Sequence, residues 1–358
     1  MIQLETIGKR FGDFEAVRSV SLTIGEGEFV SLLGPSGCGK TTTLRIVAGF
    51  ETPSSGRLLI GGRDMTGVPV ERRGLSMVFQ NYALFPHLSV FENVAFGLKL
   101  KRIAKPEIEE RVRKALDQVG LVGFDGRSPR QLSGGQQQRV SLARALVVNP
   151  SVLLMDEPLS NLDLKLREQL RSEIRSLQRS LGITAIYVTH DQDEAMAMSD
   201  RIAVMNAGRI EQVGAARDIY ERPRTTFVAS FIGQCNLLPG TLEGTRFRTP
   251  RGLTMDVEAA ATSSFERGDI RLAIRPETIH FGEVAAGNRL TARVADVVYL
   301  GDIAQVTVAP LNAGGAEAEP LVAAWRTLRG QATPAVGDRI SLAVAPADCV
   351  PVFERAPD

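Results

Sequence analysis

The sequence lacks several features that would place it in other classes of protein. It has only three cysteines among 358 residues, and no two have the CxxC spacing, so neither a disulfide framework nor a zinc site is predicted. The formal net charge is +1, with 42 basic against 41 acidic residues, which argues against nucleic acid as the main partner. No apolar run is long enough to span a bilayer, and the N-terminus lacks the charged-then-apolar pattern of a secretory signal. We therefore expect the chain to be made and kept in the cytosol.

The length and the patterning of the chain predict two domains of different class. A chain of 358 residues exceeds the size at which single cores stop growing. Residues 1–235 alternate short β-rich runs with helical patterns, which predicts an α/β domain, with a helical subdomain at about 82–148. Residues 236–358 offer short alternating segments punctuated by Gly, Pro and Asp, which predict an all-β domain shaped as a small OB-like barrel.

A glycine-rich loop, GPSGCGKTT, follows the apolar run at 29–33 and precedes a helical pattern. Glycines allow the backbone to approach a phosphate closely, while Lys40 supplies a cation for its oxygens and Thr41 a hydroxyl for magnesium. Cys38 is interpreted as a small tolerated residue, since redox reactivity requires exposure and a lowered pKa. The predicted phosphate-binding residues are Gly34, Pro35, Ser36, Gly37, Cys38, Gly39, Lys40, Thr41 and Thr42.

A second motif, LSGGQQQRV at 132–140, also predicts phosphate binding. Backbone N–H groups at the start of a helix, together with the helix dipole, form a site for an anion. The residues concerned are Ser133, Gly134, Gly135 and Gln136. Because one chain carries two such surfaces, the economical arrangement is a homodimer in which two copies clasp nucleotide between opposite motifs.

Polar residues follow three further apolar runs, where strand ends of a parallel sheet would line a ligand crevice. Asp156 and Glu157 follow VLLM, which suits a magnesium-directed carboxylate and a neighbouring acid that orients or deprotonates water, although two acids before a proline also fit a simple turn. His190 ends AIYVTH and is a candidate for holding the attacking water, against the alternative of a structural histidine. Gln80 ends LSMVF and suits contact with the metal shell. Hydrolysis is the predicted reaction.

Taken together, these motifs resemble the ATP-binding cassette family, whose ATPase subunits drive membrane transporters. The resemblance implies ATP and Mg²⁺ as ligands, with Thr41, Gln80 and Asp156 at the metal. It also implies Glu157 as catalytic base, His190 as switch histidine, and Asp163 in SNLD as a residue that crosses the dimer seam. Phe11 would stack on adenine, where the family more often has Tyr; simple packing of this ring is the alternative.

The segment at 81–97, NYALFPHLSVFENVAFG, is rich in apolar side chains next to Gln80. Core packing is the default interpretation for any one of them. In the family that the sequence resembles, this region docks a cytoplasmic helix of the membrane permease. The resemblance therefore implies permease subunits as partners and a peripheral position at the cytoplasmic face of the membrane, with a solute-binding protein as an indirect partner.

The C-terminal part, with RPE at 275–277, is similar to the TOBE-like accessory domain of certain bacterial importer ATPases. The overall likeness is strongest to polyamine-type importer subunits, with ferric-ion, sugar and phosphonate importers as close alternatives. A soluble cassette protein acting on ribosomes or damaged DNA is a second hypothesis, but the zinc modules and basic arms typical of such proteins are absent from the sequence. A third is that the C-terminal domain binds a regulator or the solute itself.

Overall fold

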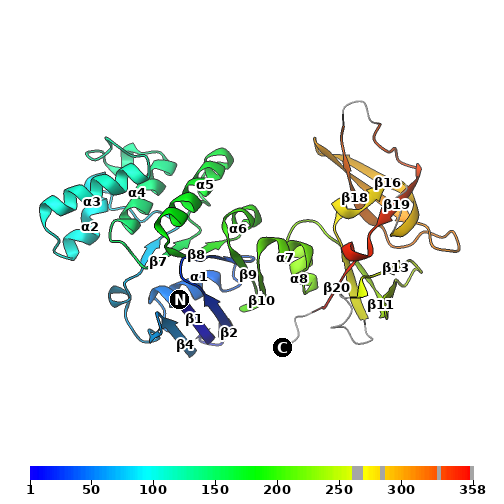
Figure 1. The fold of residues 1–358 in the computed structure, drawn as a ribbon, viewed down its shortest axis with the longest axis horizontal. Coiled ribbons are helices and arrows are strands. Elements are labelled where there is room, and N and C mark those ends of the chain that lie inside the picture. Colours follow the sequence, from blue (N-terminus) through cyan, green and yellow to red (C-terminus); the bar gives the residue numbers. More distant parts are fainter. Residues whose placement is uncertain (260–268, 283–286, 329–331, 355–358) are drawn as a thin grey trace. The chain divides into compact units, whose positions relative to one another are not determined.

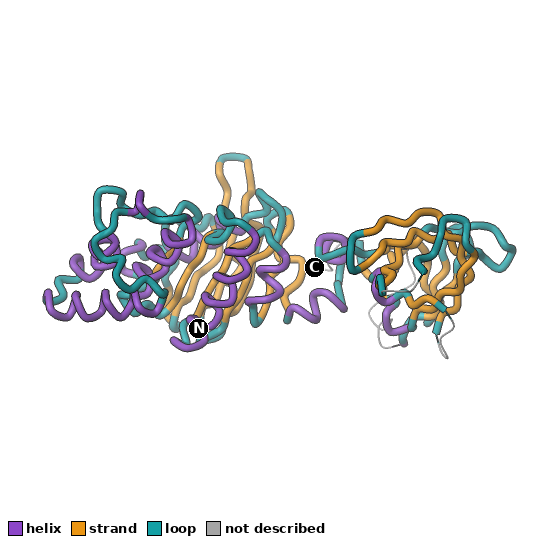
Figure 2. Tube along the Cα trace, turned by 90° about the horizontal axis from the view of Figure 1, so that it is seen from above, coloured by secondary structure: helices purple, strands orange, loops and turns teal. Residues whose placement is uncertain are grey.

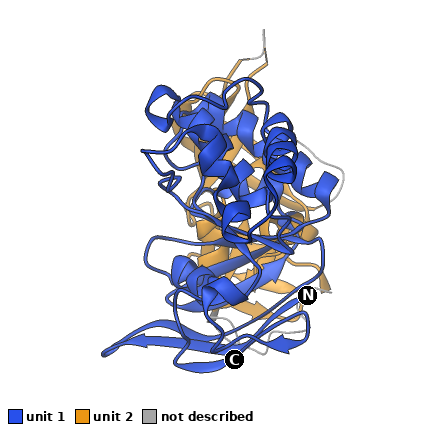
Figure 3. Ribbon diagram, turned by 90° about the vertical axis from the view of Figure 1, so that its left-hand side faces the viewer, with its two compact units in different colours: residues 1–216 blue, residues 217–358 orange. Residues whose placement is uncertain are grey.

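The computed structural model describes residues 1–259, 269–282, 287–328 and 332–354. The chain divides into two compact units, residues 1–216 and residues 217–358, which are coloured separately in Figure 3. Each unit has its own apolar core and is described separately below. Within the described ranges, every helix is too short or too polar to cross a bilayer.

The centre of the first unit is a six-stranded sheet. Its strand order is β10-β9-β3-β8-β7-β6, and all neighbours are parallel except β10 against β9. The continuous apolar runs form β3, β7 and β8, in which every residue is buried. The strands are β3 (Phe29–Leu33), β6 (Ser76–Val78), β7 (Val152–Asp156), β8 (Thr184–Thr189), β9 (Arg201–Asn206) and β10 (Arg209–Gly214).

A second sheet, which the sequence motifs do not predict, covers the first helix. It is antiparallel, with the order β2-β1-β4-β5, and shares an apolar core with α1 and with residues of the central sheet. Its strands are β1 (Ile2–Phe11), β2 (Phe14–Ile24), β4 (Ser55–Ile60) and β5 (Arg63–Asp64), and the helix is α1 (Lys40–Ala48). A short 3₁₀ turn, Val70–Arg72, follows this sheet.

Helices complete the first unit. Figure 1 shows α2 (Val90–Leu100), α3 (Lys105–Gln118) and α4 (Gly134–Leu146) grouped at one end of it, all within the predicted helical subdomain at 82–148. Figure 2 shows further helices lying along the strands; these are α5 (Leu164–Leu181) and α6 (Gln192–Met198). A 3₁₀ turn at Pro129–Gln131 leads into α4. This is the α/β architecture with a helical insert that the alternating pattern predicts.

The second unit is built from two antiparallel five-stranded sheets around one core, after two short helices, α7 (Ala216–Glu221) and α8 (Thr226–Phe231). One sheet has the order β13-β12-β11-β14-β20 and the other β15-β19-β16-β17-β18. This all-antiparallel arrangement fits the predicted OB-like domain. The strands are β11 (Asn236–Glu243), β12 (Arg246–Arg248), β13 (Thr254–Asp256), β14 (Asp269–Ile274), β15 (His280–Phe281), β16 (Asn288–Tyr299), β17 (Ile303–Pro310), β18 (Leu321–Arg326), β19 (Arg339–Val344) and β20 (Val350–Val352), with 3₁₀ turns at Pro276–Thr278 and Pro346–Asp348.

A buried arginine explains why α8 is grouped with the β-sheets. The Arg275 guanidinium donates to the carbonyls of Tyr220 at 2.9 Å, Ile232 at 2.5 Å and Gln234 at 2.9 Å. These bonds attach residues 220–234 to the start of the turn after β14. The division of the chain consequently falls at 216/217, ahead of the position 235/236 inferred from sequence composition.

Candidate functional site

The predicted site residues emerge from one edge of the central sheet. Parallel pairing aligns Leu33 of β3 with Thr189 of β8, and Val188 of β8 with Asp156 of β7. The glycine loop, His190 and Glu157 are the residues that follow these three strand ends. Because the carboxyl ends of parallel strands lie at the same edge, the topology brings together motifs that are far apart in sequence.

At Gly34 and Gly39 the backbone of the glycine loop has no space for a larger residue. A Cβ on Gly34 would lie 2.2 Å from the Met205 carbonyl oxygen, and one on Gly39 would lie 2.5 Å from the Ala16 oxygen. Gly39 also has a φ of 101°, in the left-handed region, and it precedes α1 without providing a side-chain cap. The first N–H groups of α1 therefore lack a side-chain acceptor at this end, which is the arrangement that binds phosphate.

Lys40 lies inside this loop with 4% of its surface exposed. Its ammonium donates to the carbonyl oxygens of Gly34 at 2.7 Å and Pro35 at 3.0 Å. Carbonyl oxygens carry only partial charge, so the ammonium keeps most of its attraction for an anion that enters the loop. Cys38 is buried beside it, and burial raises the pKa of its thiol, which supports the interpretation of Cys38 as a small tolerated residue that is not redox-reactive.

Thr41 and Asp156 meet as the predicted metal ligands. The Thr41 hydroxyl donates to Asp156 Oδ1 at 3.0 Å, and Asp156 is 8% exposed. Burial raises the pKa of the Asp156 carboxyl, against the lowering effect of the Thr41 hydrogen bond. In the described part of the chain no group of three or more His, Cys, Asp and Glu residues could hold a metal alone. One desolvated carboxylate with one hydroxyl instead fits Mg²⁺, which usually binds one or two protein oxygens together with phosphate and water.

Glu157 and His190 also lie side by side. His190 Nδ1 is 3.1 Å from Glu157 Oε2, and the imidazole is the more exposed of the two groups. Glu157 has a φ of 44°, a conformation that ordinary residues adopt rarely, and its N–H donates to the Val188 carbonyl at 3.0 Å. Such strain occurs where a side chain is held in a required position. A carboxylate beside an imidazole can hold a water molecule and accept its proton.

Gln80 reaches the same turn through a residue that the sequence analysis missed. Its Nε2 donates to Ser160 Oγ at 3.4 Å, and that hydroxyl donates to the Glu157 carbonyl at 2.9 Å. Asn161 also donates to the Gln80 carbonyl at 3.0 Å. Ser160 and Asn161 belong to the same SNLD segment as Asp163. Their place in that motif is the sequence signal that could have identified them as residues of the site.

The second phosphate motif forms the start of α4. The Ser133 hydroxyl accepts from the Gln136 N–H at 3.4 Å, and the Gln136 side chain accepts from the Ser133 N–H at 3.0 Å. This capping box fixes the first turn, while Ser133 and Gly134 stay exposed. The adjacent Gly135 is buried, and a Cβ there would lie 2.6 Å from Leu166 Cδ2. The motif therefore presents a rigid helix N-terminus at the surface.

Asp163 and Phe11 are both at the surface. Asp163 caps α5, with its carboxylate accepting from the Leu166 N–H at 3.1 Å. Phe11 is 45% exposed at the end of β1, and the Lys9 ammonium lies 4.8 Å from the ring centroid. This exposure disfavours the alternative that Phe11 is a packing residue and leaves aromatic surface available for stacking.

The chain forms a strained turn directly after Gln80, which the sequence pattern does not predict. Tyr82 and Ala83 have φ values of 60° and 46°. The Arg144 guanidinium donates to the Tyr82 carbonyl at 2.8 Å and to the Ala83 carbonyl at 2.7 Å, and the Ser141 hydroxyl donates to Tyr82 at 3.0 Å. Because Ser141 and Arg144 lie on α4, these bonds attach the Gln80 loop to the helix that carries the second phosphate motif.

The apolar segment at 81–97 is divided between core and surface. Val90 and Val94 are fully buried, as the default interpretation expects, whereas Phe96 is exposed and packs on Phe85 with ring centroids 4.6 Å apart. Leu100 is also exposed, one turn further along α2. The surface beside the Gln80 loop therefore includes apolar groups.

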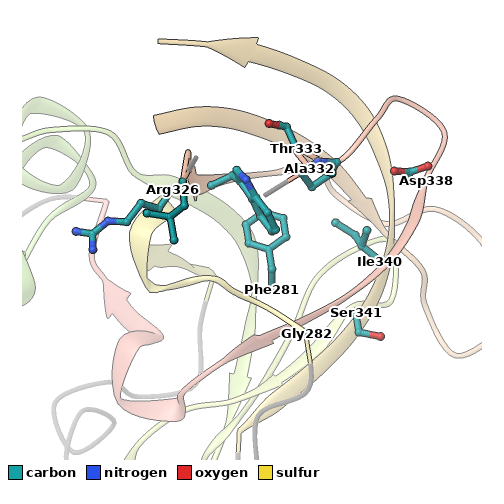
Figure 4. Close-up of a pocket in the computed structure, with 11 residues that line it drawn as sticks. Phe281, Gly282, Arg326, Ala332, Thr333, Asp338, Ile340 and Ser341 are labelled. Atoms are coloured by element: carbon teal, nitrogen blue, oxygen red, sulfur yellow. The ribbon is translucent and has the colours of Figure 1, made fainter. Parts of the chain in front are cut away.

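A separate hollow of about 610 Å³ lies in the second unit. Its wall includes Phe281 and Trp325, whose rings meet edge to face at 4.7 Å, and Asp338, as Figure 4 shows in part. No residue predicted from the phosphate motifs contributes to it.

Comparison with known proteins is consistent with this geometry. The family described as ABC transporter matches residues 17–160, and the TOBE domain matches residues 272–352. The spermidine/putrescine import ATP-binding protein of Rubrobacter xylanophilus is 56% identical over 312 residues, covering 85% of this chain and 82% of that protein. The Fe(3+) ions import ATP-binding protein of Brucella abortus is 51% identical over 305 residues, covering 84% and 85%. A solved dimeric ATP-binding cassette bound to ADP and phosphate is 34% identical, with a TM-score of 0.54, and covers 61% of this chain and 99% of that one.

Proposed function

This chain belongs to the ABC transporter family as an ATP-hydrolysing subunit, and we propose that the solute whose import it drives is a polyamine. The support is the ranking of its relatives. A relative named for spermidine and putrescine import is 56% identical, whereas one named for ferric-ion import is 51% identical over a similar share of the chain. Ferric ion is therefore the alternative solute.

In this proposal the glycine loop binds the phosphates of ATP and Phe11 stacks on adenine. Thr41 and Asp156, with Gln80 nearby, hold Mg²⁺, which when bound neutralises negative charge on the phosphate oxygens. Glu157 accepts the proton of the attacking water. His190 holds that water in position relative to Glu157. The 3.1 Å contact between the His190 and Glu157 side chains supports this role.

The second phosphate motif acts in a homodimer. Ser133 and Gly134 are exposed at the N-terminus of α4, and Asp163 is exposed at the N-terminus of α5, so both helix ends are available to a second copy. We propose that each ATP is bound between the glycine loop of one copy and the Ser133 motif of the other. The dimer would close on ATP and open after hydrolysis, and this motion would be transmitted to permease subunits bound beside the Gln80 loop. The protein would act at the cytoplasmic face of the membrane, with a solute-binding protein as an indirect partner.

The observation that carries this proposal is the meeting of the Thr41–Asp156 and Glu157–His190 pairs at adjacent strand ends. The decisive variant is Glu157→Gln, which keeps the shape of the side chain but cannot accept a proton. We expect its ATPase rate to fall by about 100-fold or more, while ATP still produces a stable dimer in size-exclusion chromatography with light scattering. Lys40→Ala is the matched control and should lose ATP binding and dimerisation together. A parental ATPase rate in Glu157→Gln would refute the assignment of the base.

The solute is tested separately. The chain, its permease and its solute-binding protein are reconstituted in proteoliposomes, and ATPase activity is measured with spermidine or with ferric ion. We expect stimulation by spermidine only. Stimulation by ferric ion alone would exclude the polyamine assignment and leave the ATPase assignment unaffected.

A further inference from the structure

We propose that Arg167 is a positioning residue for hydrolysis, which holds the turn that carries Asp163 and the turn that carries His190 in one arrangement. This inference rests on the proposed function, because it assumes that Glu157 and His190 act on ATP. It goes further by identifying how the surface offered to the second copy is connected to the hydrolytic pair.

One guanidinium contacts both turns. Arg167 Nη2 donates to the Leu162 carbonyl at 3.1 Å, and Leu162 directly precedes Asp163. Arg167 Nη1 donates to Asp191 Oδ2 at 3.0 Å, and Asp191 directly follows His190. The Arg167 and Asp191 side chains are 24% and 22% exposed, so this ion pair is screened less than a surface pair.

Asp191 is itself held rigidly. Its second carboxylate oxygen accepts from the Glu194 N–H at 3.1 Å and caps α6, and its own N–H donates to Thr189 Oγ1 at 2.9 Å. His190 lies between Thr189 and Asp191 in the chain. A displacement of Asp191 therefore moves the backbone that places His190 at 3.1 Å from Glu157.

A buried carboxylate, that of Glu194, lies near both this turn and Arg167. Glu194 is 3% exposed and accepts from Tyr187 Oη and Thr189 Oγ1, each at 2.7 Å. Arg167 Nε lies 3.9 Å from the other Glu194 oxygen. The planar guanidinium of Arg167 thus lies near two carboxylates, those of Asp191 and Glu194, and can interact with both simultaneously. A lysine ammonium is a single point charge and could not replace it in this geometry.

Two other arginines on α5 show what a purely structural role would look like. Arg171 donates to the Asp193 carbonyl at 3.3 Å, and Arg175 pairs with Asp200. Both connect α5 to the segment after β8, as Arg167 does, but within the described residues their hydrogen bonds and ion pairs involve neither Leu162 nor Asp191. Arg171→Met is consequently a matched control for Arg167→Met, one helical turn away.

The test is steady-state ATPase kinetics of the purified full chain, with thermal unfolding of each variant. We expect Arg167→Met to lower kcat by about 10- to 100-fold with KM for ATP nearly unchanged, because misplacing a catalytic group affects the reaction more than binding. Arg167→Lys should fall between this variant and the parent. Arg171→Met should keep the parental kcat even if its Tm falls as much as that of Arg167→Met.

Asp191→Asn provides a second route, since the amide oxygen can still cap α6 while the ion pair is lost. It should lower kcat as Arg167→Met does, and the double variant should be no slower than either single one. Parental kcat in Arg167→Met or Asp191→Asn, equal losses in Arg167→Met and Arg171→Met, or additive losses in the double variant would overturn the inference. If Arg167→Met does not fold, Asp191→Asn and Arg167→Lys decide the matter. Failure of the proposed function is recognised separately, by a parental protein without ATPase activity or a Glu157→Gln variant that hydrolyses normally.

Discussion

The Thr41 hydroxyl donates a 3.0 Å hydrogen bond to the Asp156 carboxylate across 115 residues of sequence. The bond joins the first turn of α1 to the end of β7, and it connects the phosphate loop to the acidic turn. It holds both oxygens close together, which reduces the cost of organising a metal site there.

The buried Asp156 carboxylate should cost stability while the site contains no metal. Burial raises the pKa of Asp156, so its ionised form is less favourable in the folded protein than in the unfolded chain. Above its raised pKa the ionised Asp156 carboxylate costs the native protein stability, and Asp156→Asn removes this cost while keeping an acceptor for Thr41. We expect the nucleotide-free variant to have a higher Tm than the parent at pH 7. The difference should shrink as pH falls through the raised pKa and disappear below the ordinary value of 3.8.

Thermal unfolding with and without Mg²⁺ and ATP checks this prediction. Added Mg²⁺ and ATP should reverse the order, because only the parent offers a carboxylate to the metal. A nucleotide-free Asp156→Asn protein that is less stable than the parent from about pH 4 to pH 8 would contradict the expected linkage.

The two glycines of the Ser133 motif should respond differently to alanine. A Cβ on Gly134 would meet Leu162 Cδ2 at 3.3 Å, whereas one on Gly135 would lie 2.6 Å from Leu166 Cδ2. Alanine gains about 1 kcal/mol over glycine inside a helix, and overpacking costs about 1–3 kcal/mol. Gly134→Ala should therefore match or exceed the parental Tm, and Gly135→Ala should fall below Gly134→Ala.

The expected functional effect of Gly134→Ala distinguishes Gly134 from an ordinary packing position. If the exposed turn of α4 approaches a phosphate in the homodimer, Gly134→Ala should lose ATP-induced dimerisation in spite of its unchanged stability. The measurement is light scattering in a Glu157→Gln background, where hydrolysis does not reopen the dimer. Normal dimerisation of Gly134→Ala would count against direct contact between this turn and nucleotide.

Much of the site could be predicted because its residues lie in short local motifs. Strand, glycine loop and helix are contiguous at 29–48, and the apolar runs before Asp156 and His190 indicated strands that end where polar residues begin. The antiparallel sheet of β1, β2, β4 and β5 was not predicted, because its pairings join segments with no shared motif. Local patterns thus found the loops of the site but not the sheet that covers α1.

The residues that hold these loops in place were beyond sequence reasoning. Arg144 and Arg167 occur among many arginines with helical spacing, and a solvated helix face is the simplest interpretation of each. Only the fold shows that Arg144 bonds the Tyr82 and Ala83 carbonyls and that Arg167 spans two turns. Their partners are largely backbone carbonyls, which have no signature in the sequence.

Arg275 gives a prediction for the second unit. Its guanidinium is buried, donates to the carbonyls of Tyr220, Ile232 and Gln234, and stacks 4.2 Å from the Tyr220 ring centroid. Arg275→Met keeps the apolar stem but leaves these carbonyls without a donor, at about 1–3 kcal/mol for each one that stays buried. We expect a loss of about 3 kcal/mol or more in the stability of residues 217–358.

The control for this variant lies on β14, four residues earlier. Arg271 forms an exposed ion pair with Glu354 at 2.7 Å, and such pairs contribute about 1 kcal/mol or less. In calorimetry of the full chain with Mg²⁺ and ATP, Arg275→Met should lower the ligand-insensitive transition by roughly 10 °C, and Arg271→Met should barely change it. Equal shifts in the two variants would mean that the carbonyl contacts of Arg275 do not attach α8 to the sheets. The transition that ATP raises should be the same in both proteins, because the glycine loop and its partners all lie within residues 1–216.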